Sequence, residues 1–157
     1  IAVRMVTPSQ EELVARKVAD IPMRMCAHHS YLDKNGTPQT PLDLLEHTLI
    51  GQDRADDFIR GFREFGAQID RHAFRFRSDD QVILWNAMLS GVGIGIAQGP
   101  LIRQHKELVT FLPNLPIPHL PCWITMHKDV RTSPRIRRVA DFLYAALSDF
   151  ARSAAAV

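Results

Sequence analysis

The chain has 157 residues, of which 46% are hydrophobic and 23% are charged, and 19 Lys and Arg against 17 Asp and Glu give a formal net charge of +2. This length suits a domain that buries roughly 70% of its unfolded surface, and the near balance of charge gives no case for a nucleic-acid or anionic-membrane partner. No apolar stretch approaches the ~20 residues of a membrane helix and no signal peptide is recognised, so we expect a cytoplasmic protein.

The first part of the chain predicts short elements. The opening run IAVRM is apolar and β-branched like the middle of a strand, which suggests that the sequence begins inside a strand. Residues 9–18 predict a helical turn or a loop, and residues 21–27 predict a strand. The run TPLDLLEH predicts a helix with Thr40 as its N-cap and Pro41 at its first position, where the missing N–H of proline would be unpaired anyway.

The middle of the chain predicts a short buried strand at 48–51, and Asp56 and Asp57 after it suit the start of a helix. Strand-like pieces at AQIDR and FRFRS follow.

A stronger helix is predicted over residues 81–90, capped by Asp79 or Asp80. Its apolar residues exceed one face, so Ile83 and Leu84 should remain outside and need cover from another chain. The residues expected to face inward are Val82, Trp85, Met88 and Leu89.

The last part predicts a strand at GIGIAQ, a proline-rich segment, a strand at LPCWITM and a long helix that Ser133 caps and Pro134 opens. One apolar stripe follows that helix: Ile136, Val139, Ala140, Leu143, Ala146, Leu147 and Phe150. The alternation of strands and helices predicts an α/β architecture with mainly parallel sheets.

The glycine run Gly91, Gly93 and Gly95 does not predict a nucleotide-binding loop. A dinucleotide fingerprint follows a strand and precedes a helix, so that the helix N-terminus faces the pyrophosphate, and here the order is reversed. We therefore expect Gly91 to end the helix in the left-handed region and the other two glycines to allow close packing.

Four segments occur in an order that resembles the C-terminal effector-binding domain of LysR-type transcriptional regulators. They are IAVR, LVARKVADIPMRMCAHHSYLDKNGTPQTPLDLLEH, SDDQ…WNAMLSGVGIGIAQ and LPCWITMHKDVRTSPRIRRVADFL, and together they cover nearly the whole chain. The resemblance implies a fold like that of type II periplasmic binding proteins, with two α/β subdomains, two crossover strands and a cleft for a small coinducer.

The resemblance also implies how the chain is divided. Subdomain I would consist of residues 1–22 and 122–157, and subdomain II of residues 23–121. Family members carry a winged helix-turn-helix, a linker helix and the first strands and helices of subdomain I before their equivalent of IAVR. Subdomain I is therefore expected to be incomplete, and DNA binding would need a helix-turn-helix that this chain lacks.

The two crossover segments, IPMRMCA and LPCWITM, are expected to run side by side as a hinge. Cys26 and Cys122 would then be neighbours; the alternative is that they are two separate small buried residues. With 96 residues between them and no CxxC spacing, we expect reduced thiols.

Candidate ligand contacts lie at four places. Two follow the strands IAVR and TLIG, because open α/β sheets bind ligands beyond the carboxyl ends of their strands. The third is the start of the helix over 81–90, which the resemblance places at the cleft, and the fourth is on the returning strand. The candidates are Arg4, Met5, Thr7, Gln52, Asp53, Arg54, Asp79, Asp80, Gln81 and Trp123.

These candidates also have structural interpretations. Asp79 and Asp80 could simply cap a helix, Arg54 could form a surface ion pair, and Trp123 could pack in the core. We expect the effector to be a small anion, most simply a carboxylate, held by Arg54 and Arg4 with a helix N-terminus. Aspartates facing the ligand would favour an amine or a polyol instead.

Neither a metal site nor an enzyme is predicted. The seven histidines have no metal-ligand spacing, and His28 and His29, adjacent on a strand, would point to opposite faces: His28, His29, His47, His72, His105, His119 and His127. No G-x-S-x-G elbow surrounds Ser30, Ser78, Ser90 or Ser133. We expect no cofactor.

The predicted function is effector binding and oligomerisation for a LysR-type regulator, as a homodimer or tetramer, with no membrane partner. The alternative is a solute-binding protein of the same fold. A basic cluster is interpreted either as a solvated face or as a contact to another domain or subunit: Lys128, Arg131, Arg135, Arg137 and Arg138.

Overall fold

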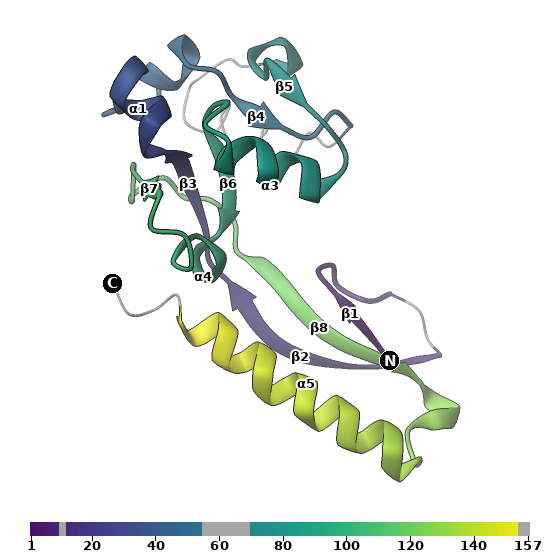
Figure 1. Ribbon diagram of the computed structural model, residues 1–157. Coiled ribbons are helices and arrows are strands. Elements are labelled where there is room, and N and C mark those ends of the chain that lie inside the picture. The colour runs from purple at the N-terminus through teal and green to yellow at the C-terminus, as the bar shows by residue number, and fades with distance from the viewer. Residues whose placement is uncertain (10–11, 55–69, 154–157) are drawn as a thin grey trace. The chain divides into compact units, whose positions relative to one another are not determined.

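The computed structural model describes residues 1–9, 12–54 and 70–153 (Figure 1). They belong to two compact units, which are described separately below. Unit 1 comprises residues 1–22 and 118–157, and unit 2 comprises residues 23–117. The helix start expected at Asp56 and Asp57, and most of the run AQIDR, lie outside the described residues.

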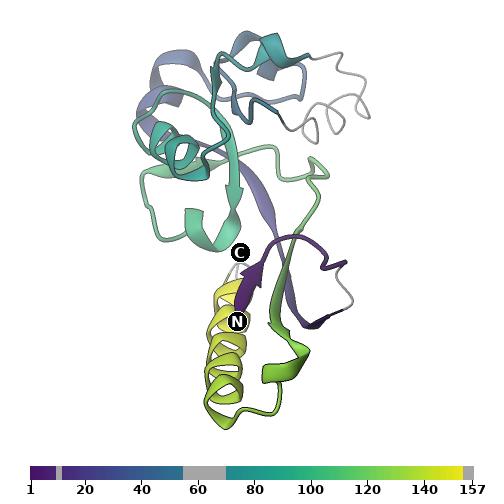
Figure 2. The same ribbon diagram turned by 90° about the vertical axis from the view of Figure 1, so that its right-hand side faces the viewer.

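Unit 1 is a three-stranded antiparallel sheet with one long helix along it (Figure 2). The strand order is β1–β8–β2, with β1 at Ala2–Arg4, β2 at Leu13–Ile21 and β8 at Leu120–His127. The 3-10 helix η3 (Lys128–Val130) leads to α5 (Pro134–Arg152).

The helical turn or loop expected at residues 9–18 is wrong, because most of that segment belongs to β2. The ladder between β2 and β8 runs from Leu13 opposite His127 to Ile21 opposite Leu120, with an irregularity between Lys17 and Ala19. Long-range pairing outweighs the weak local signal of a segment whose polar and apolar residues do not alternate cleanly.

Helix α5 begins as predicted, with Ser133 at the N-cap and Pro134 in its first turn, although the Ser133 side chain makes no capping hydrogen bond. It packs on β2, where the Arg16 guanidinium lies 3.5 Å from the centroid of the Tyr144 ring. The predicted apolar stripe is only partly covered within the described residues: Ala140 is buried, whereas Val139 is 49% exposed.

Unit 2 contains two sheets and several short helices. The strands β3 (Met23–His28), β6 (Gly95–Gln98) and β7 (Leu108–Thr110) form an antiparallel sheet in the order β6–β3–β7, and β4 (Ile50–Gly51) pairs in parallel with β5 (Phe76–Arg77). The helices are α1 (His29–Asn35), η1 (Asp43–Glu46), η2 (Arg71–Ala73), α3 (Gln81–Leu89) and α4 (Gly99–Ile102).

Two expectations about strand pairing are corrected. The sheets are not mainly parallel, since both three-stranded sheets are antiparallel and only β4–β5 is a parallel ladder among the described strands. The returning strand, β8, does not pair with the run IPMRMCA: its partners are β1 and β2. The segments that continue from one unit into the next each find a partner within their own unit.

The two cysteines follow from this pairing. Cys26 lies opposite Gly95 and Thr110 in the sheet of unit 2, and Cys122 lies opposite Ala19 in the sheet of unit 1. Both are buried free thiols, and burial raises the pKa of the Cys26 thiol to about 12. The interpretation as separate small buried residues therefore fits the observed registers.

The helix expected at TPLDLLEH is shorter than predicted. Its only helical part is the 3-10 helix η1, and Thr40 is not its N-cap. Instead the Asp43 carboxylate accepts hydrogen bonds from the Thr40 hydroxyl, the Thr40 N–H and the Gln39 N–H, which lowers the pKa of this carboxyl. The acidic side chain thus supplies the turn that the threonine was expected to begin.

Helix α3 turns a different face inward from the one predicted. Leu84, Ala87 and Met88 are buried against β3, β4 and β6, whereas Val82 is 67% exposed. Ile83, which was expected outside, is 48% exposed. The spacing i, i+3, i+4 is preserved, but an apolar helix offers more than one such stripe, and only the packing of the sheet selects among them.

The glycine run has the predicted structural role. Gly91 adopts a φ of +70° directly after the C-cap of α3. A Cβ on Gly93 would lie 2.2 Å from the Thr48 carbonyl oxygen, and a Cβ on Gly95 would lie 2.4 Å from the Met88 sulfur. The glycines therefore let the chain turn out of α3 and enter β6 against its neighbours.

Candidate functional site

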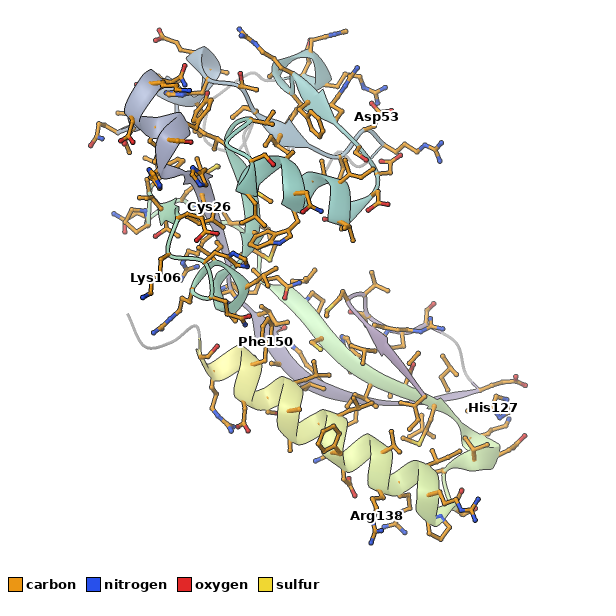
Figure 3. The ribbon with its side chains drawn as sticks, in the orientation of Figure 1. Cys26, Asp53, Lys106, His127, Arg138 and Phe150 are labelled. Carbon is orange, nitrogen blue, oxygen red and sulfur yellow. The ribbon has the colours of Figure 1, made fainter. Side chains whose placement is uncertain are left out.

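The main candidate site lies in unit 2, where the loop after β4 meets the loop before α3. The Oδ1 atom of Asp79 accepts hydrogen bonds from the backbone N–H groups of Asp53 and Arg54, at 3.2 and 3.0 Å. Figure 3 labels Asp53 beside this helix start. A single carboxylate thus fastens the end of one strand to the beginning of a helix.

Two ion pairs complete this loop pair. Arg54 Nε lies 3.2 Å from Asp79 Oδ2, and Arg77 Nε lies 3.4 Å from Asp53 Oδ1. The Arg54 side chain is 89% exposed, so the pair is screened by solvent and contributes little to stability. The ion pair expected as the structural interpretation of Arg54 is present, and its Nη groups have no recorded partner among the described residues.

The start of α3 is capped by Asp80 and not by Asp79. Asp80 Oδ1 accepts from the N–H groups of Val82 and Ile83, at 2.8 and 3.3 Å, and the Asp80 N–H donates to Ser78 Oγ. The two aspartates thus have separate tasks, one as the cap and the other as the loop tether. Gln52 and Gln81, the remaining candidates here, make no recorded side-chain hydrogen bond.

The other candidates lie in unit 1. Arg4 ends β1 directly opposite Trp123 of β8, while Met5 and Thr7 follow the strand. Trp123 is half-buried, and its indole nitrogen, Nε1, is buried without a hydrogen-bond partner among the described residues. The structure therefore brings Arg4 and Trp123 together, and it groups Asp53, Arg54, Asp79 and Asp80 around one loop pair in unit 2.

The histidines at the start of α1 correct a prediction. His28 and His29 do not point to opposite faces: their rings stack with centroids 4.5 Å apart, because β3 ends at the first and α1 begins at the second. His28 caps α1, accepting from the Ser30 N–H and lying 2.8 Å from Ser30 Oγ. Within the described residues, no group of three or more His, Cys, Asp or Glu is arranged to hold a metal ion.

Sequence reasoning missed two cations that the structure places beside the candidates. Lys17 lies opposite Trp123 on the strand that was not predicted, and Arg77 pairs with Asp53 from the end of β5. The signal for Lys17 was the strand register, which is visible only once β2 is recognised as a strand.

The family is decided by comparison with known proteins. A sequence model of the LysR substrate binding domain matches residues 1–148. The chain belongs to this family. Its mixed α/β fold is the type II periplasmic-binding-protein-like fold of LysR substrate-binding domains, and within the described residues no helix is both long and apolar enough to cross a membrane.

Similar proteins include the probable HTH-type transcriptional regulator SinR of Salmonella typhimurium, 25% identical over 141 residues. That alignment covers 85% of this chain but only 45% of SinR, so the LysR domain described here spans less than half of that relative.

Solved structures agree on the fold. The regulatory domain of CrgA from Neisseria meningitidis has a TM-score of 0.76 at 24% identity, over 92% of this chain and 74% of that one. The AmpR effector binding domain from Citrobacter freundii has a TM-score of 0.70 at 20% identity, over 90% and 70%.

Proposed function

We propose that this LysR domain is the sensing part of a transcription regulator and that it binds a small-molecule effector. The observation that carries the proposal is the family match over nearly the whole chain, joined to a structured loop pair at strand ends, where α/β domains bind ligands. The matched family and the similar structures are regulators, which favours this function over a free-standing solute-binding protein or an enzyme. DNA recognition would belong to a helix-turn-helix outside these residues.

We propose a carboxylate as the ligand class at the loop pair of unit 2. Asp79 and Asp80 were the argument against an anion, but their carboxylates accept protein N–H groups and so are already partnered. Arg54 uses Nε for Asp79 and keeps its Nη edge available for a two-pronged bond to a carboxylate. The nearby start of the nine-residue helix α3 favours an anion by roughly 0.3–1 kcal/mol.

A thermal-stability screen tests this proposal. Small carboxylates, amines and sugars are compared as additives, since a ligand at a hundred times its dissociation constant stabilises the folded state by about 2.7 kcal/mol. We expect a carboxylate to raise the melting temperature and Arg54→Ala to abolish that rise, with the unliganded melting temperature nearly unchanged because Arg54 is so exposed.

The matched control is Arg24→Ala, which removes another exposed arginine of unit 2 and should keep the response. A response confined to amines or sugars, or a carboxylate response that survives Arg54→Ala, would reject the carboxylate site.

A further inference from the structure

Three side chains form a row across the sheet of unit 1. Trp123 lies in the central strand β8, with Arg4 directly opposite on β1 and Lys17 directly opposite on β2. Directly paired residues of an antiparallel ladder present their side chains on the same face, with Cβ atoms roughly 4.5–5.5 Å apart. The Lys17 side of this row is visible in the contact itself, since Lys17 Nζ lies 5.9 Å from the centroid of the Trp123 ring.

This row contains donors without acceptors. Trp123 Nε1 is buried and has no hydrogen-bond partner among the described residues, and the Arg4 guanidinium makes no recorded hydrogen bond or ion pair with them. An indole N–H can only donate, and a guanidinium also offers only donors. A buried donor without an acceptor costs free energy, so the row is incomplete without a group that accepts.

The charges around the row indicate which acceptor fits. Lys17 Nζ is 2.7 Å from Asp20 Oδ2, so its charge is largely offset by that carboxylate. Arg4 has no such partner among the described residues, which leaves an excess of one positive charge at the row. One excess charge suits a monoanion such as a carboxylate better than the phosphate dianion, and the guanidinium fork matches the two oxygens of a carboxylate.

We propose that Arg4, Trp123 and Lys17 form a carboxylate-binding site in unit 1. Arg4 and the Trp123 N–H donate to the carboxylate oxygens, and Lys17 adds charge from the far strand. The site is independent of Arg54 and its loop pair, and so it extends the proposed function to residues of the other unit. Either proposal can fail without the other.

The single-tryptophan variant Trp85→Phe provides a local probe. The chain has two tryptophans, so this change leaves Trp123 as the sole source of tryptophan emission. We expect acetate and propionate to shift that emission saturably when ionic strength is held constant with chloride. We expect Arg4→Gln to weaken the apparent affinity roughly tenfold or more, because a charged hydrogen bond is lost, and Lys17→Met to weaken it less.

Controls separate this site from other effects. Arg138→Ala removes an exposed arginine of α5 (labelled in Figure 3), and Arg54→Ala disables the loop pair of unit 2; neither should change the titration of Trp123. Circular dichroism verifies that each variant is folded, and Arg4→Lys, which keeps the charge but loses the fork, should retain part of the affinity.

Emission that does not respond to either acid overturns the proposal, because the indole N–H then needs only water. An equal response to inorganic phosphate that Arg4→Gln leaves unchanged also overturns it.

Discussion

At the scale of single residues, Gly93 is the position where the sequence is most constrained by close packing. Its nearest neighbour is a backbone atom, the Thr48 carbonyl oxygen, which also accepts a hydrogen bond from the Ile94 N–H at 2.8 Å. A backbone oxygen held in a ladder cannot rotate away from a new methyl group. The glycine therefore permits the approach of β6 to the chain before β4, which positions the loop of the candidate site.

We predict that Gly93→Ala destabilises the protein by about 2–3 kcal/mol, because the Cβ would lie 2.2 Å from the Thr48 oxygen and the strand must shift. Urea unfolding measures the difference. The matched control is Gly36→Ala, where φ is +81° and nothing lies within 4 Å of the new Cβ, so that only the left-handed backbone opposes alanine, at roughly 1 kcal/mol. Equal losses at the two glycines would contradict the role given to close packing.

At the scale of secondary-structure elements, the sequence predicted those with strong local signals. Asp80 as a cap, Gly91 as the end of α3 and Pro134 in the first turn of α5 are all visible as residue types at fixed positions. β2 was missed because its pairing with β8 joins residues more than a hundred positions apart. The inward face of α3 was missed for the same reason, since β3, β4 and β6 determine it.

The candidate site follows the same division. The sequence indicated Asp53, Arg54 and Asp79 because they follow a strand or precede a helix. It did not indicate that Asp79 bonds to both backbone N–H groups of the other loop, because that contact depends on β4 and β5 lying in parallel. Position in a fold is readable from the pattern, whereas the partner of each side chain requires the tertiary structure.

The outer face of α3 yields a prediction about assembly. Val82 and Ile83 are adjacent, 67% and 48% exposed, on a helix that is apolar elsewhere. We propose that this face is covered by a second copy of the chain. The double variant Val82→Ser, Ile83→Ser should therefore shift the sedimentation profile toward monomer at high concentration.

A matched control is available in η1 and the residue before it. Leu42 and Leu45 are also exposed, at 60% and 46%, and Leu42→Ser with Leu45→Ser should leave the assembly unchanged. A wild-type protein that sediments as a strict monomer, or an equal effect of the two double variants, would show that the α3 face has no such partner.

At the scale of the whole molecule, the chain carries two separate sets of donors in two units. In unit 2 the carboxylates of Asp79 and Asp80 are occupied by backbone N–H groups, which leaves Arg54 as the outward charge. In unit 1 the row across β1, β8 and β2 offers donors that lack acceptors among the described residues. Both arrangements favour anionic ligands, although the net charge of the chain is only +2.

The most direct test of the central claim, that this LysR domain binds an effector at the loop pair of unit 2, is an amide NMR titration with the best stabilising carboxylate. We predict saturable shifts of the Asp53 and Arg54 amides and of the Val82 amide in the first turn of α3, and their loss in Arg54→Ala. A carboxylate that binds saturably without moving any of these three amides would contradict the claim.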